Sequence, residues 1–157
     1  MSIDRRTLLL ALPAGLLAAR AGAHHGWSSF DESAPLYLEG VARDVRWQNP
    51  HVELVVDVSD DLALPADLAK RSVPAQKAQV DGPGLLARAK LPARRGPWTC
   101  ELAPLTRMQA WAVPRIAPGD RVAMLGYTFA GDRGERTLRA EYIWLGGRAY
   151  PLRSLPA

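Results

Sequence analysis

The sequence predicts a mainly β domain, a small five-stranded barrel of the OB type with one short helix and an Ala/Pro-rich insertion. Apolar and polar residues alternate in five short runs, and turn residues separate these runs. The one helical run stands between the third and fourth strands, which is the order of an OB barrel. Closing so small an antiparallel sheet also removes its exposed edges. An open sandwich is the alternative with the same spacing.

The first two strands are expected over residues 36–47 and 51–58, joined as an antiparallel hairpin around Gln48-Asn49-Pro50. Asn tolerates turn geometry, and Pro cannot extend a ladder. In the first run the expected apolar face consists of Tyr37, Val41, Val45 and Trp47. In the second run one face is apolar and the other begins with His51, so this histidine is not an ordinary core residue. Glu53 and Asp57 share its face and are candidates to orient the imidazole.

Residues 60–96 are rich in Ala and Pro, and we expect a partly ordered excursion on the surface with short helical turns at 65–71 and 84–90. The remaining strands are expected at 97–103, 121–129 and 136–145. Between the first two of these, Thr106 is expected to cap a helix over 107–112, which ends before Pro114. The expected apolar face of the last strand consists of Leu138, Ala140, Tyr142 and Trp144.

Residues 1–23 have the features of a cleaved export signal. Arg5-Arg6 precede an apolar run, and Ala21-Gly22-Ala23 is a small-residue cleavage site of the A-x-A kind. The run is shorter than the roughly 20 residues that a membrane span needs. A twin-arginine route and a general secretory route both fit the segment. Either route predicts a periplasmic or otherwise extracytoplasmic protein without a membrane span after processing.

Processing would leave residues 24–157, enough for a single domain. The removed segment holds three arginines and one aspartate, so the net charge falls from +4 to +2. That excess is too small for a protein that neutralises many phosphates, and nucleic acid is not an expected partner. Cys100 is the single cysteine, so no intramolecular disulfide can form. It shares a face with Trp98 and Leu102, which favours a small buried thiol over a metal thiolate.

The three histidines are the candidate metal ligands. His24 and His25 would begin the mature protein, and His51 follows the Asn49-Pro50 turn. Cleavage after Ala23 would give His24 a free α-amine beside its imidazole, and nitrogen donors so concentrated suit copper(II). Two arrangements are open, one in which His24 chelates through its amine and ring, and one in which the amine and the next amide bind with His25. A metal-donor or metal-acceptor protein would be the partner.

The alternative is a metal-free binding module, in which the terminal histidines are solvated. The barrel face and residues 60–96 would then hold a partner protein or a small ligand. A catalytic function is less favoured than either. Ser28 and Ser29 lie near His25 and Asp31, but no glycine-framed nucleophile elbow accompanies them. Gly146-Gly147 follows a strand with no helix behind it, so it is not a phosphate-binding loop.

Several motifs together resemble an uncharacterised family of small exported bacterial proteins. They are the start His24-His25-Gly26-Trp27-Ser28, the strand ending in Gly40-Val41, and the turn Trp47-Gln48-Asn49-Pro50-His51. Residues 101–108 and Gly119-Asp120 also look like the second half of that family. The resemblance covers most of residues 24–145. It implies an exported β-rich domain and brings no assigned role or binding residues.

Overall fold

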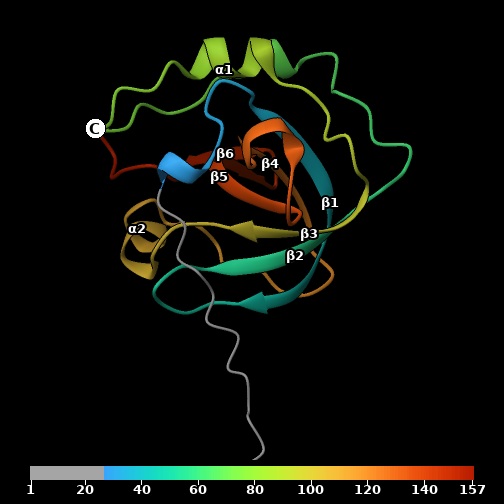
Figure 1. Ribbon diagram of the computed structural model, residues 1–157. Helices are drawn as coiled ribbons and strands as arrows, with labels where there is room; N and C mark the ends of the chain where they lie inside the picture. Colours follow the sequence, from blue (N-terminus) through green and yellow to red (C-terminus); the bar gives the residue numbers. More distant parts are fainter. Residues whose placement is uncertain (1–26) are drawn as a thin grey trace, which may run out of the picture.

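The computed structural model describes residues 27–157, shown in Figure 1. Two short helices and six strands occur in this part of the chain, together with three 3₁₀ turns at Trp27–Ser29, Leu68–Lys70 and Ala130–Asp132. The helices are α1 (Gly82–Arg88) and α2 (Leu105–Ala110). The strands are β1 (Leu36–Arg46), β2 (Glu53–Val58), β3 (Gly96–Glu101), β4 (Arg121–Tyr127), β5 (Thr137–Leu145) and β6 (Arg148–Pro151).

The first five strands form a closed barrel. The strand order is β3-β2-β1-β4-β5-β6, and a parallel pairing of β3 with β5 closes the circle. This pairing and the position of α2 between β3 and β4 confirm the predicted five-stranded OB-like fold. The sequence did not predict β6, which continues from β5 through a tight turn at Gly146 and Gly147, both with positive φ.

The barrel interior is the main core, and α2 lies at one end of it (Figure 1). Met108 and Trp111 pack together into this core, as their spacing predicts. The prediction that Thr106 caps the helix is wrong, because α2 begins at Leu105 directly after Pro104. The Asn49 side chain accepts a hydrogen bond from the Leu105 N–H at 3.1 Å. The hairpin turn therefore supplies the acceptor that the helix start lacks in its own sequence.

The insertion at residues 60–96 forms a second layer, in which the turn at Leu68–Lys70 and α1 lie where the sequence predicts helical turns. In Figure 1 it arches over one side of the barrel with α1 across the top. Its buried residues include Leu68, Leu85 and Leu86, which pack against the outer face of the barrel. The barrel side of this second core consists of Tyr37, Leu125, Tyr127, Tyr142, Trp144 and Ala149.

The strands have two apolar faces where the sequence predicted one. In β1, Leu36, Leu38 and Ala42 point into the barrel, whereas Tyr37 belongs to the second core and Val41 is exposed. In β5 the predicted face is split by a bulge, since Gly126 pairs with Ala140 and Leu125 with Tyr142. The extra residue is Glu141, so Leu138 and Ala140 point inward while Tyr142 and Trp144 point outward.

Candidate functional site

Of the three predicted metal ligands, only His51 lies in the described part of the chain; His24 and His25 lie outside the described residues. His51 directly precedes the buried Val52, and its own side chain is partly exposed. The hydrogen bonds from Val52 N to the Ala103 oxygen and from Leu102 N to the Val52 oxygen continue the β2–β3 pairing past the end of the strand. The backbone of His51 is therefore held beside the barrel, with its ring on the outer face.

The strand register brings two further charged residues, Glu101 and Arg139, to the outer face that bears His51. Glu53 of β2 pairs with Glu101 of β3, and Glu101 pairs with Arg139 of β5 across the parallel seam. Because side chains alternate along a strand, His51 lies on the same face as Glu53 and thus close to Arg139. Arg139 donates to a Glu101 carboxylate oxygen at 2.8 Å, and both side chains are largely buried.

His51 and Arg139 are in direct contact. Nη2 of Arg139 lies 3.3 Å from Nε2 of His51. A guanidinium can only donate, so Nε2 of the imidazole must be the acceptor, and the proton of the neutral ring then resides on Nδ1. The contact assigns the tautomer of His51 in this arrangement.

Trp27 anchors the start of the described chain on the same face. Its ring centre lies 5.0 Å from the guanidinium carbon of Arg139 and 4.0 Å from that of Arg153. The ring also meets Tyr127 edge-on, with the ring centres 6.3 Å apart. Three residues later the segment is fixed again, where Phe30 forms a bridge with Phe129 and the two rings stack. One guanidinium, that of Arg139, thus touches both Trp27 and His51.

Arg153 is the centre of a partly buried network beside Trp27. It donates to Glu141 at 2.7 Å and to Glu32 at 2.9 Å, and Gln76 of the insertion donates to the other oxygen of Glu141 at 3.0 Å. Glu141 is fully buried, and burial raises the pKa of its carboxyl, which the charge of Arg153 offsets in part. The network thus joins β5, the insertion and the C-terminal segment to Glu32 near the start of the described chain.

Sequence reasoning missed the roles of Arg139, Arg153 and Glu141. It proposed Glu53 and Asp57 as partners of His51, but these carboxylates form ion pairs with Arg46 and Arg43 of β1. Glu101 is linked to His51 through Arg139. An arginine inside a strand pattern that is otherwise apolar, as at Arg139 between Leu138 and Ala140, was the signal that could have found it.

The sulfur atoms of the described chain belong to the core. Cys100 is buried beside Trp98, as predicted, and burial raises the pKa of its thiol, so that it does not present a thiolate. Met108 and Met124 are also buried in the barrel interior. Among residues 27–157, no three His, Cys, Asp or Glu side chains gather closely enough to hold a metal ion. The same residues include no helix with the length and apolar character to cross a membrane.

The face around His51 is thus an anchoring surface on a five-stranded OB-like barrel, built from Trp27, His51, Glu101 and Arg139. Residues 14–66 match the model of a family of unknown function, DUF6152. The match confirms the resemblance to an uncharacterised family for a segment that includes the three histidines and the Asn49-Pro50 turn. No curated protein and no solved structure matches the chain.

Proposed function

We propose that this is an exported protein that binds a transition metal, copper in the first place, and handles or delivers it rather than using it in catalysis. The proposed donors are the α-amine of His24, the imidazole of His24 or His25, and the imidazole of His51. One observation carries the proposal: Arg139 contacts both Trp27, which follows the histidine pair, and His51. The chain that leaves Trp27 toward the pair therefore starts on the face that bears His51.

Covalent geometry gives the histidine pair sufficient reach. His24 stands three positions before Trp27, and an extended chain spans about 3.5 Å per residue, so the Cα atom of His24 lies within about 11 Å of that of Trp27. His25 is one residue closer. Copper(II) binds nitrogen ligands more tightly than the other common divalent metals, which favours copper for an amine and two imidazoles. The buried thiol of Cys100 and the core methionines are not among the proposed donors.

The contact with Arg139 makes metal binding at His51 a displacement. A metal at Nε2 requires Arg139 to give up its hydrogen bond and remain with Glu101, the carboxylate that neutralises it at 2.8 Å. A metal at Nδ1 instead displaces the proton that the contact places there, so binding by this route releases a proton. In both cases Glu101 lowers the repulsion between the metal ion and the guanidinium.

The proposal depends on export and cleavage after Ala23, because only processing creates the free amine of His24. Its first test is copper(II) titration of the processed protein, in competition with a chromophoric chelator, for the wild type and for His51→Ala. We expect the variant to bind at least about tenfold more weakly, a loss of about 1.4 kcal/mol. Glu53→Gln is a matched control, because Glu53 lies on the same face but pairs with Arg46. Unchanged affinity in His51→Ala would remove this residue from the site.

A further inference from the structure

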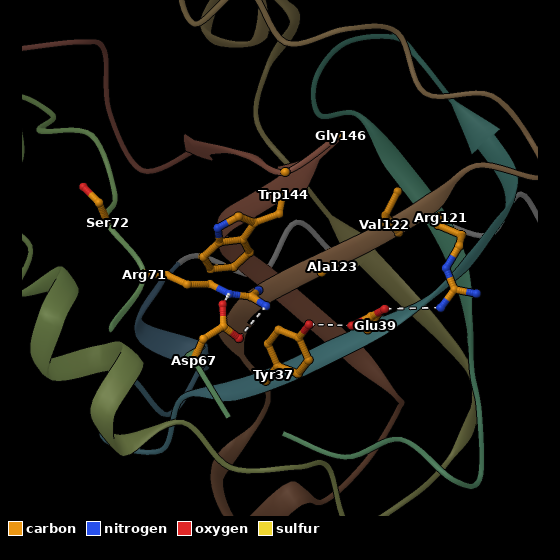
Figure 2. A pocket seen from close by; sticks show the side chains of 11 residues that line it. Tyr37, Glu39, Asp67, Arg71, Ser72, Arg121, Val122, Ala123, Trp144 and Gly146 are labelled. Atoms are coloured by element: carbon orange, nitrogen blue, oxygen red, sulfur yellow. Dashed lines mark hydrogen bonds and ion pairs between the residues drawn. The ribbon is translucent and has the colours of Figure 1, made fainter. Parts of the chain in front are cut away.

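A cavity of about 580 Å³ lies between the insertion and the barrel, where residues 67–72 face the outer surface of β1, β4 and β5 (Figure 2). The turn at Gly146 and Gly147 borders it. This volume is within the range of about 300–1,000 Å³ that is typical of small-molecule sites. The cavity shares no residue with the face around His51, so its function does not depend on the copper proposal.

The floor of the cavity is apolar. It is formed by Trp144 of β5 and Ala123 of β4, which both face the second core. Trp144 is only 7% exposed and is held in the second core, with its ring next to Tyr142. Such a rigid aromatic floor suits an apolar group of a ligand, since burying that group removes its surface from water.

The wall of the cavity carries two cations and two anions in alternation. Arg71 binds Asp67 with two hydrogen bonds of 3.0 and 3.2 Å, and Arg121 binds Glu39 at 3.2 Å. Tyr37 lies between the pairs and donates to Glu39 at 2.6 Å. Burial raises the pKa of the Tyr37 hydroxyl, and Glu39 raises it further, so this hydroxyl stays protonated and Glu39 stays the acceptor. The four formal charges of the wall cancel.

One donor in the lining of the cavity, the indole N–H of Trp144, has no acceptor among the described residues. The indole N–H groups of Trp98 and Trp111, the other buried tryptophans of residues 27–157, donate to the carbonyl oxygens of Arg94 and Ser154. No described residue accepts from the indole N–H of Trp144, whose nitrogen lies on the side of Ser72 in Figure 2. Arg71 uses Nε and Nη2 for Asp67 and also interacts with Tyr37. The indole N–H of Trp144 belongs to the lining of the cavity, where a ligand oxygen can accept from it.

We propose that this cavity binds a small zwitterion, an α-amino acid with an apolar side chain. Its carboxylate meets the Arg71 and Trp144 donors, its ammonium group faces Glu39, and its side chain lies on the floor of Trp144 and Ala123. A simple anion would face Asp67 and Glu39 without compensation, and a simple cation would face Arg71 and Arg121. A ligand with both charges complements a wall that presents both signs of charge.

The test follows the NMR resonance of the Trp144 indole N–H in ¹⁵N-labelled protein. This resonance is assigned by its absence in Trp144→Phe. L-phenylalanine and L-leucine are titrated with a chelator present, so that no copper–amino acid complex forms. Saturable binding should shift the Trp144 signal downfield and leave those of Trp98 and Trp111 in place. N-acetyl-L-phenylalanine, an anion, and L-phenylalaninamide, a cation, should bind at least about tenfold more weakly. No shift with either amino acid, or equal binding of all the phenylalanine probes, would overturn the proposal.

Three variants distinguish a loss of ligand binding from a loss of folding. Arg71→Gln should weaken L-phenylalanine binding at least about tenfold. Arg71 is partly buried against Tyr37, so Arg121→Gln is the second variant; its side chain is 76% exposed and its loss should leave folding intact while weakening binding. Arg88→Gln is the matched control, an exposed arginine of the same insertion that pairs with Asp81. If Arg121→Gln and Arg88→Gln bind L-phenylalanine as the wild type does and folded Arg71→Gln does too, the assignment is wrong.

Discussion

The guanidinium of Arg139 and the imidazole of His51 are held 3.3 Å apart, although 88 positions separate them in the sequence. The parallel seam of β3 and β5 brings them together, since it places Arg139 opposite Glu101 at the end where β2 begins. A Cβ atom on Gly126 would collide with the carbonyl oxygen of Arg139, so glycine at this position lets β4 approach the bulged part of β5. Barrel closure, rather than local sequence, positions the candidate site.

The ion pair beneath His51 should be important for stability. Glu101→Gln leaves Arg139 buried with a weaker partner, so we expect the free energy of unfolding to fall by about 3 kcal/mol. Glu53→Gln is the control from the neighbouring register position, where the pair with Arg46 is exposed to solvent, and its cost should stay below about 1 kcal/mol. Urea unfolding of both variants measures the difference. Equal costs would contradict the burial argument.

Trp27 should control copper affinity without being a ligand. Its contacts with Arg139 and Arg153 are each worth about 1 kcal/mol, and they fix the start of the segment that follows the histidine pair in the sequence. Trp27→Ala should therefore weaken copper(II) binding about tenfold, whereas Trp27→Phe should keep most of the affinity. Titration of both processed variants gives the answer. Full affinity in Trp27→Ala would show that anchoring is not needed.

The insertion should contribute to global stability, because it closes the second core. Leu86 is 2% exposed, and Leu86→Ala should cost about 3 kcal/mol in the free energy of unfolding. Leu64 belongs to the same insertion but is 41% exposed, and Leu64→Ala should cost less than about 0.5 kcal/mol. Thermal and urea unfolding should each show one cooperative transition. A separate early transition in the wild type would mean that the insertion is an independent layer.

Glu141 should make stability depend on pH in a defined direction. Burial raises the pKa of this carboxyl above its ordinary value of 4.5, so the folded protein holds the proton more tightly than the unfolded chain. The stability from this group is complete below pH 4.5 and is lost as the pH rises through the folded-state pKa. The free energy of unfolding of the wild type, minus that of Glu141→Gln, should decrease as the pH rises above 4.5. An increase would show that Arg153 outweighs burial.

The fold could be predicted from the sequence wherever a local pattern decides it. The alternation in residues 52–58 and in Trp98, Cys100 and Leu102 predicts faces that the structure confirms, and the order of strands and helix predicts the barrel. The predicted apolar faces of β1 and β5 were wrong. The insertion covers the outer surface of the barrel, so both sides of these strands are apolar, and the bulge at Glu141 reverses which residues of β5 point inward. Periodicity cannot show which of two apolar faces points inward.

The candidate site was predictable only in part. Residue types and spacing single out His51, and its exposure on the outer face of β2 agrees with the alternation. The partners of His51 depend on pairing between strands that are far apart in the sequence, and no local pattern specifies that register. Glu53 and Asp57, the carboxylates predicted to orient His51, form ion pairs with arginines of β1, which no local pattern predicts either.

The most direct measurement is a copper(II) titration of three processed forms: the wild type, His24→Ala, and a form whose α-amine at His24 is acetylated. Acetylation keeps every imidazole but removes the amine as a donor, so it isolates the amine chelate. We expect the acetylated form to bind at least about tenfold more weakly than the wild type, and His24→Ala to do the same if the ring of His24, rather than that of His25, is the donor. Equal affinity in all three would contradict a site built on the amine of His24.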